Sequence, residues 1–228
     1  MDSVEKLLEQ ARKQREQAKS ALALDTCTKA LLLAQRKGNR EQLIQVFVDR
    51  EIVWRHMFEG TNDITFAILA RQDAHTILDM VKMWGVSERL HTAYFMLGQA
   101  ALLFQDYVEA ENYFFKSLRY FKGSQAEKGS WRYHWAKALY KIGEKKRALL
   151  AFSQAINEIK ARKKTIDTFL YNVYLSGAYA NFAFVLKKDD SKTAQRYFDL
   201  AKEIIDSDKR LVVRKKQFKE LAKHFKGR

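Results

Sequence analysis

One short segment, "SWRYHWAKALYK" at residues 130–141, has the residue types and spacing of a binding surface. Tyr133, Lys137, Tyr140 and Lys141 lie four, three and one residues apart, which places them along one side of a helix. The tyrosines offer flat apolar anchors and the lysines offer cations. We therefore predict that this stripe contacts a partner with acidic and apolar groups; the alternative is an ordinary solvated face.

Patterns that would indicate catalysis or metal binding are weak. The five histidines are scattered, and no two lie three or four residues apart: His56, His75, His91, His134 and His224. One cysteine, Cys27, cannot build a thiolate zinc site or an internal disulfide, and its small apolar neighbours predict a buried residue. The nucleophile, phosphate-loop and dinucleotide motifs do not occur. We expect no enzyme activity, no metal and no cofactor.

The composition predicts an all-α protein with a basic surface. The 228 residues are long enough to bury a core, 47% are hydrophobic, and none is proline. No run of 18 apolar residues occurs and the first residues are charged, so we expect a cytoplasmic protein without a membrane span. The net charge of +15 favours an anionic partner, which includes nucleic acid, anionic lipid and acidic protein segments.

Two segments repeat one pattern of small and aromatic residues. Residues 91–121 align with residues 129–159 at a constant offset of 38. The matches are Gly98 with Ala136, Ala110 with Ala148, Phe114 with Phe152, and Ser117 with Ala155. Looser copies of the small–x–small part are Ala23-Cys27-Ala30, Ala67-Arg71-Ala74 and Ala194-Phe198-Ala201. Helix axes approach to about 8 Å only where small residues meet, so these positions predict close helix contacts.

The pattern resembles the tetratricopeptide repeat, a helix–turn–helix unit with the signature W-x₂-L-G-x₂-Y…A-x₃-F…A. Tyr94, Leu97 and Gly98 fit its first half in one copy, and Trp135 and Leu139 fit in the other. The resemblance implies a right-handed α-solenoid of about five antiparallel helix pairs. It also implies one domain over residues 1–228, closed by a capping helix at residues 207–228.

In that family the first helices of successive pairs line a concave groove that takes a peptide. Carried over by position, the implied groove residues are Phe95, Gln99, Tyr133, His134, Lys137, Tyr140 and Lys141. The same register adds Arg12 and Arg15 in the first pair. Phe95 and Gln99 stand where some members carry a lysine–asparagine clamp for carboxylates, so that clamp is not reproduced. For Phe95 the alternative is ordinary core packing.

Two functions of different classes follow. We expect a protein-interaction scaffold that binds a peptide or partner domain in its groove. The alternative is a helical-repeat protein that binds nucleic acid through basic clusters at residues 160–164, 187–188 and 214–216. No side-chain code of one base per repeat is visible, which favours the scaffold. Neither the identity of the partner nor the oligomeric state is indicated.

Local signals place the helix boundaries. Asn39-x-x-Gln42 and Asp106-x-x-Glu109 have the form of capping boxes, and Gly38, Gly60, Gly123, Gly129 and Gly143 are predicted to lie in turns. The predicted helices are 4–17, 20–37, 40–58, 63–83, 88–104, 107–121, 130–142, 145–163, 166–187, 191–206 and 208–225. The last is apolar on one face and basic on the other, which favours a cap; a basic helix for a membrane surface or nucleic acid is the alternative.

Overall fold

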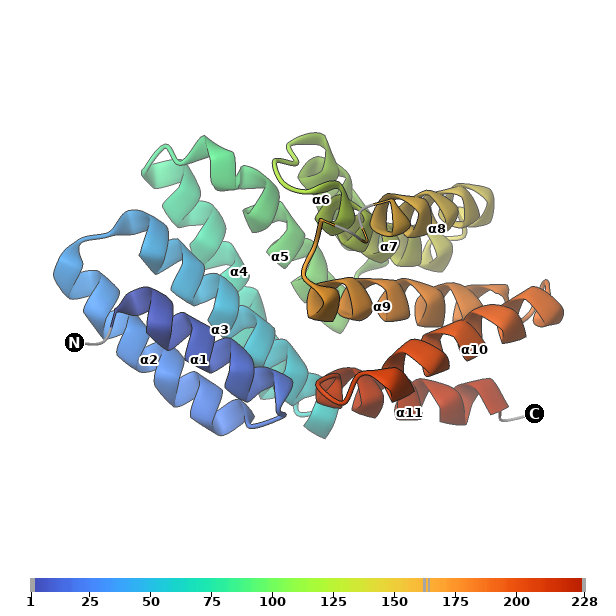
Figure 1. The fold of residues 1–228 in the computed structure, drawn as a ribbon. Helices are drawn as coiled ribbons and strands as arrows, with labels where there is room; N and C mark the ends of the chain where they lie inside the picture. The colour runs from blue at the N-terminus through green and yellow to red at the C-terminus, as the bar shows by residue number, and fades with distance from the viewer. Residues whose placement is uncertain (1–2, 162, 164, 227–228) are drawn as a thin grey trace. The chain divides into compact units, whose positions relative to one another are not determined.

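The chain folds into helices arranged in two compact units (Figure 1). The computed structural model describes residues 3–161, 163 and 165–226. The first unit comprises residues 1–120 and the second comprises residues 121–228, and each is described by itself. The prediction of an all-α fold is confirmed, whereas one domain over residues 1–228 stays a prediction.

Three helix pairs build the first unit. In chain order they are α1 (Val4–Glu16) with α2 (Ser20–Lys37), α3 (Arg40–Thr61) with α4 (Ile64–Met83), and α5 (Leu90–Leu103) with α6 (Tyr107–Arg119). A short 3₁₀ turn, η1 (Ser87–Arg89), precedes α5. Each helix packs along its partner, and α2, α3, α4 and α5 also pack in sequence, so the pairs lie side by side.

The second unit contains two helix pairs and a final helix. They are α7 (Gln125–Lys141) with α8 (Lys145–Lys160), α9 (Thr168–Leu186) with α10 (Ser191–Ser207), and α11 (Val212–Lys226). The helix α9 packs against α7, α8, α10 and α11, so it is the centre of this unit. Its sequence explains this position, because it is apolar on most sides and carries no acidic or basic residue.

Small residues at the repeated positions are buried, as the pattern predicts. The confirmed positions are Ala23, Cys27, Ala30, Ala67, Ala74, Ala110, Ser117, Ala148, Ala155, Ala194 and Ala201. A Cβ on Gly98 would lie 2.7 Å from two ring carbons of Phe114, so this glycine lets the ring of the second helix press on the first. The interpretation of Gly98 as a contact point is therefore confirmed.

Two predicted turns are wrong. Gly60 lies inside α3, which continues to Thr61 and ends at Asn62 in the left-handed conformation (φ 58°). Gly129 lies inside α7, which starts at Gln125 because the Ser124 side chain accepts a hydrogen bond from the Glu127 amide at 3.2 Å. A Cβ on Gly129 would lie 2.6 Å from the carbonyl oxygen of Ala155, so this glycine serves helix packing instead of a turn.

The predicted capping signals are confirmed at their first residues. The Asn39 side chain accepts from the Gln42 amide at 3.0 Å, and the Asp106 side chain accepts from the Glu109 amide at 3.3 Å. Gly38 ends α2 with a φ of 63°, a conformation that costs glycine little. These caps satisfy backbone groups that a helix end leaves open.

The final helix α11 is held by aromatic contacts. Phe218 and Phe225 are buried, and their ring centroids lie 4.6 and 4.3 Å from that of Phe198 on α10. Leu211, just before the helix, is buried as well. The apolar face of α11 is thus used inside the second unit, and the face available to a partner is the basic one.

Candidate binding surfaces

Two predicted groove residues of the first unit, Phe95 and Gln99, are buried. The Phe95 ring lies 5.6 Å from that of Phe114, which is the core packing named as its alternative. Gln99 is 4% exposed, and its Oε1 accepts from Nη1 of Arg55 at 3.3 Å. Within the part of the chain that the structure describes, the buried Gln99 Nε2 atom has no hydrogen-bond partner. Contact of either residue with a partner stays a prediction.

In the second unit the predicted residues fall into a buried and a more exposed group. Tyr133 is 3% exposed, and a Cβ on Gly177 of α9 would lie 2.9 Å from its hydroxyl oxygen. His134, Lys137 and Tyr140 are half-buried, and Lys141 is exposed. The structure therefore brings Tyr133 into the core instead of placing it beside Lys141 on an open face. Of these residues, only Lys141 is exposed on α7.

An arginine from the last helix lies beside the same glycine as Tyr133. Arg214 of α11 donates from Nη2 to the carbonyl oxygen of Val173 at 3.3 Å, and that nitrogen lies 3.1 Å from where a Cβ of Gly177 would be. Only a glycine leaves room for both the tyrosine and the arginine. Side chains from α7 and α11 therefore meet the same glycine of α9.

The excess of positive over negative charge lies in the second unit. Residues 121–228 contain 26 Lys and Arg against 11 Asp and Glu, whereas residues 1–120 contain 16 of each. The whole net charge of +15 therefore belongs to the second unit, and the first is neutral. Counting charges by halves of the sequence would have found this division. A surface with such an excess attracts anionic groups before contact is made.

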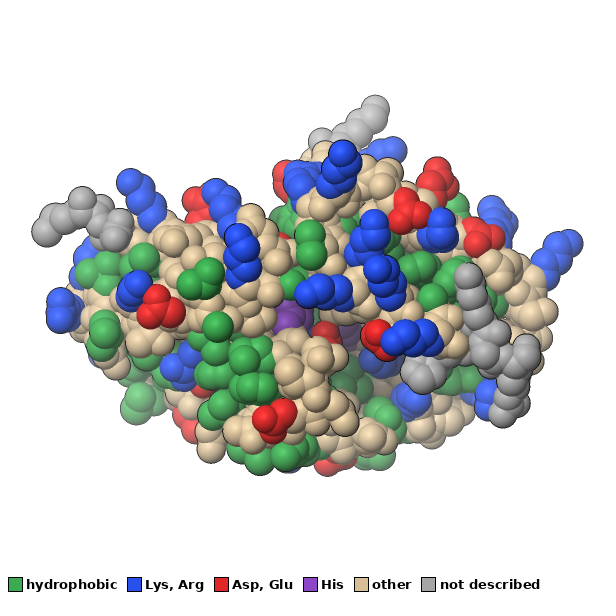
Figure 2. Space-filling model, turned by 90° about the horizontal axis from the view of Figure 1, so that it is seen from below, with side chains coloured by type: hydrophobic (Ala, Val, Ile, Leu, Met, Phe, Trp, Pro, Cys, Tyr) green, Lys and Arg blue, Asp and Glu red, His purple; other side chains and the backbone are tan. Residues whose placement is uncertain are grey.

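Lysines occupy the open face of α11. Lys215, Lys216, Lys219 and Lys223 are exposed, and Glu220, the one acidic residue of this helix, pairs with Lys223 at 2.8 Å. Figure 2 shows Lys and Arg side chains spread over the part of the second unit that faces the viewer. Arg162 and Lys164 of one predicted basic cluster lie outside the described residues.

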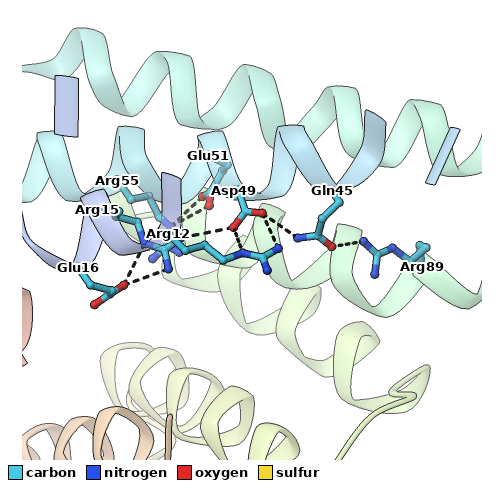
Figure 3. A network of polar contacts seen from close by, with 8 residues as sticks. All are labelled: Arg12, Arg15, Glu16, Gln45, Asp49, Glu51, Arg55 and Arg89. Carbon is cyan, nitrogen blue, oxygen red and sulfur yellow. Dashed lines mark hydrogen bonds and ion pairs between the residues drawn. The ribbon is translucent and has the colours of Figure 1, made fainter. Parts of the chain in front are cut away.

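A network of arginines and carboxylates joins α1 to α3 in the first unit (Figure 3). Arg12 donates from Nε and Nη2 to the two carboxylate oxygens of Asp49 at 2.8 and 2.7 Å. Nη1 of Arg15 lies 3.6 Å from the same carboxylate. Asp49 is buried, so two arginines provide the compensation that a buried charge needs. The contacts of Arg12 and Arg15 therefore stabilise the packing of α1 against α3.

The network continues along α3. The Gln45 amide donates to Asp49 at 3.2 Å and accepts from Arg89 at its other end. Nearer the end of α3, Glu51 is fully buried and its carboxylate lies 2.9 Å from Nε of Arg55. Burial raises the pKa of Glu51 to about 7, although Arg55 opposes the shift. Figure 3 shows these side chains reaching from α1, α3 and η1 toward one another.

Sequence reasoning missed most of this network. Arg12 and Arg15 were placed by register, but Asp49 and Arg89 were not singled out. Glu51 and Arg55 are four residues apart on one helix, a spacing that signals an ion pair. Asp49 lies 37 residues from Arg12 and has no such local signal.

The residues considered for chemistry are dispersed. Burial raises the pKa of the Cys27 thiol to about 12, so the side chain stays protonated and apolar. Among the residues that the structure describes, no three His, Cys, Asp or Glu side chains are grouped to hold a metal. The His224 side chain lies outside the described part. Over the same part of the chain, the helices are too short or too polar to cross a membrane.

The fold and these surfaces define an all-helical, repeat-like protein with a neutral first unit and a basic second unit. No protein-family model matches the sequence, and no curated protein matches it. A crystal structure of BtubC (BKLC) from P. vanneervenii is similar, with a TM-score of 0.64 and 19% sequence identity. The similarity covers 90% of this chain and 80% of that one. At this level of identity the likeness concerns the fold.

Proposed function

We propose that the protein is an interaction scaffold whose second unit binds the acidic groups of a protein or peptide partner. The charge division carries the proposal, because all of the net charge of +15 lies in residues 121–228. If the positive charge served only solubility, it could be distributed over both units, but the first unit has no net charge. Concentrated charge of one sign increases the rate at which an oppositely charged partner associates.

The repeat-like fold supports a scaffold. We infer that the helix pairs form a right-handed solenoid of the tetratricopeptide type, with α11 as its cap, in a cytoplasmic protein. Among the predicted groove residues of the second unit, Lys141 is exposed and Lys137 is half-buried, and the exposed lysines of α11 add to the cationic surface of this unit. Tyr133 contributes by packing α7, which carries Lys137 and Lys141, against Gly177 of α9.

Binding of a labelled Glu-rich peptide to the full chain tests the proposal. Replacement of Lys215, Lys216 and Lys219 together by glutamate should weaken binding about tenfold, because three exposed cations become repulsive. Fluorescence anisotropy over a series of salt concentrations measures the effect. Affinity of the wild type should fall as salt rises.

A matched variant in the first unit controls for total charge. Lys6, Lys19 and Arg36 are also exposed, and their replacement by glutamate changes the net charge equally. This variant should bind the peptide within about twofold of wild type, a difference of ~0.4 kcal/mol. Equal loss in both variants would show that overall charge, instead of the second unit, controls binding.

Nucleic acid is the alternative partner that the same charge excess favours. A single-stranded RNA with the charge of the peptide separates the two classes. If RNA binds more tightly than the peptide and its affinity falls steeply with salt, the protein is a nucleic-acid binder and the scaffold proposal is wrong.

A further inference from the structure

The second helix pair departs from the repeated pattern at one position. Phe114, Phe152 and Phe198 occupy this position in three other pairs and are buried. In α4 the position holds Arg71, whose side chain is 40% exposed. A position that a buried aromatic ring fills in three other pairs, and the buried Cys27 in the first, is therefore partly exposed here.

Arg71 lines an open depression of about 710 Å³ that lies wholly in the first unit. Its apolar lining comes from three helices: Phe47 on α3, Ile68 on α4 and Phe104 at the end of α5. Ile68 is 46% exposed, so its apolar side chain is accessible to a ligand in the depression. Pockets that hold small molecules or anchor side chains measure roughly 300–1,000 Å³. The depression therefore has room for an aromatic side chain.

The two arginines of the depression differ in their availability. Arg50 donates to both carboxylate oxygens of Asp73 at 2.8 and 2.6 Å, so its guanidinium is already paired with a carboxylate. Arg71 lies over the Phe104 ring at 5.1 Å, and its contact with Glu109 is long at 3.4 Å and half-exposed. A guanidinium has five N–H donors, so Arg71 retains donors for a further acceptor.

We propose that this depression binds an aromatic side chain of a partner protein together with a neighbouring carboxylate. The ring packs against Phe47, Ile68 and Phe104, and the carboxylate accepts hydrogen bonds from Arg71. Exposed His75, one turn along α4 from Arg71, lines the same depression and adds a second polar contact. The site supplies an apolar anchor in the neutral first unit. That its biological ligand is a protein rests on the proposed scaffold function.

Titration of the full chain with small peptides tests the site directly. The probe is acetyl-Trp-Glu-amide, and the readout is the NMR signal of the Ile68 methyl group. A saturable shift of Ile68 is expected, with no shift of Ile156 in the second unit. Acetyl-Trp-Gln-amide should bind several-fold more weakly. If acetyl-Ala-Glu-amide shifts Ile68 as strongly as the Trp probe, the aromatic anchor does not exist and the proposal is overturned.

Two substitutions of Arg71 test separately the open volume of the depression and the positive charge of the guanidinium. Arg71→Phe introduces the aromatic that three other pairs carry and should abolish the Ile68 shift, while a melting temperature no lower than wild type shows an intact fold. Arg71→Gln keeps the space and should remove the preference for the Glu probe over the Gln probe. Arg36→Phe, an equal change on exposed α2 surface, should leave the titration unchanged. Unaltered probe binding by Arg71→Phe would refute the site.

Failure here is distinguishable from failure of the proposed function. The triple glutamate variant of α11 leaves the depression untouched and should titrate like wild type. A nucleotide is the competing ligand, because a base also stacks on aromatic and guanidinium groups. If adenosine monophosphate shifts Ile68 at lower concentration than acetyl-Trp-Glu-amide, the depression is a nucleotide site and the peptide proposal is wrong.

Discussion

At the scale of single residues, Gly98 sets the distance between two helices. A Cβ at this position would overlap the Phe114 ring at 2.7 Å, and both residues are buried. Gly98→Ala should therefore lower the free energy of unfolding by about 1–3 kcal/mol, the usual cost of overpacking. Chemical denaturation measures the change.

Gly60 is the matched control for this prediction. It is also helical, but a Cβ there meets no atom within 4 Å. Gly60→Ala should raise the free energy of unfolding by up to ~1 kcal/mol, because alanine favours a helix more than glycine does. If both substitutions have the same sign, the contact of Gly98 with Phe114 does not set the spacing.

Glu51 should make stability depend on pH. Its pKa is raised from 4.5 to about 7 by burial, so the folded chain holds a proton that the unfolded chain releases in that interval. The contribution of Glu51 to stability is complete below pH 4.5 and is lost as pH rises through about 7. Relative to Glu51→Gln, the free energy of unfolding of the wild type should fall by up to ~3 kcal/mol as pH rises across this window.

Denaturation of both proteins at about pH 5 and pH 8 measures this difference, on either side of most of the titration. Glu9→Gln removes an exposed carboxylate and should show the same slope as wild type. If Glu51→Gln also keeps the wild-type slope, the Glu51 carboxyl is charged throughout and Arg55 outweighs its burial.

At the scale of elements, α11 combines an apolar attachment with a basic face. Phe218 packs on Phe198, so Phe218→Ala should lower the free energy of unfolding by about 3–5 kcal/mol because of the cavity it leaves. Hydrogen exchange should show the loss of protection in α9, α10 and α11, with the first unit unchanged. Leu150→Ala on the exposed surface of α8 is the control and should change stability by less than about 0.5 kcal/mol.

The helices themselves were largely predictable because their signals are local. Asn39 and Asp106 mark helix starts by hydrogen bonds to residues three positions away. The glycines were harder to interpret, since the same residue type permits a turn at Gly38 and a close helix contact at Gly129. Which of these applies depends on the neighbouring helix, and that helix is distant in sequence.

The binding residues were less predictable than the helices. Register along α7 placed Tyr133 with Lys137 and Lys141, yet Tyr133 is buried, and its hydroxyl lies beside Gly177, which Arg214 also approaches. Those two contacts come from α9 and α11, which the repeat pattern of α7 does not describe. Burial of a groove residue is thus decided by helices beyond its own pair.

At the scale of the whole molecule, charge divides the two units. One unit is neutral and contains the aromatic-lined depression at Arg71; the other holds the entire net positive charge. The proposed partner accordingly has both acidic and aromatic groups. The acidic groups would be bound by charge and the aromatic group mainly by apolar packing. Salt should therefore weaken binding of the acidic groups to the second unit far more than binding of the aromatic group in the depression.

The amino-acid sequence by itself determined that the chain is helical and that small residues recur where helices meet, because capping, propensity and spacing act over a few residues. Only the tertiary structure decided that Arg12 meets Asp49 and that Arg55 meets Gln99, pairs 37 and 44 residues apart. It also decided that Arg71 borders an open depression. Such contacts depend on the length and rotation of each helix, which no short stretch of sequence encodes.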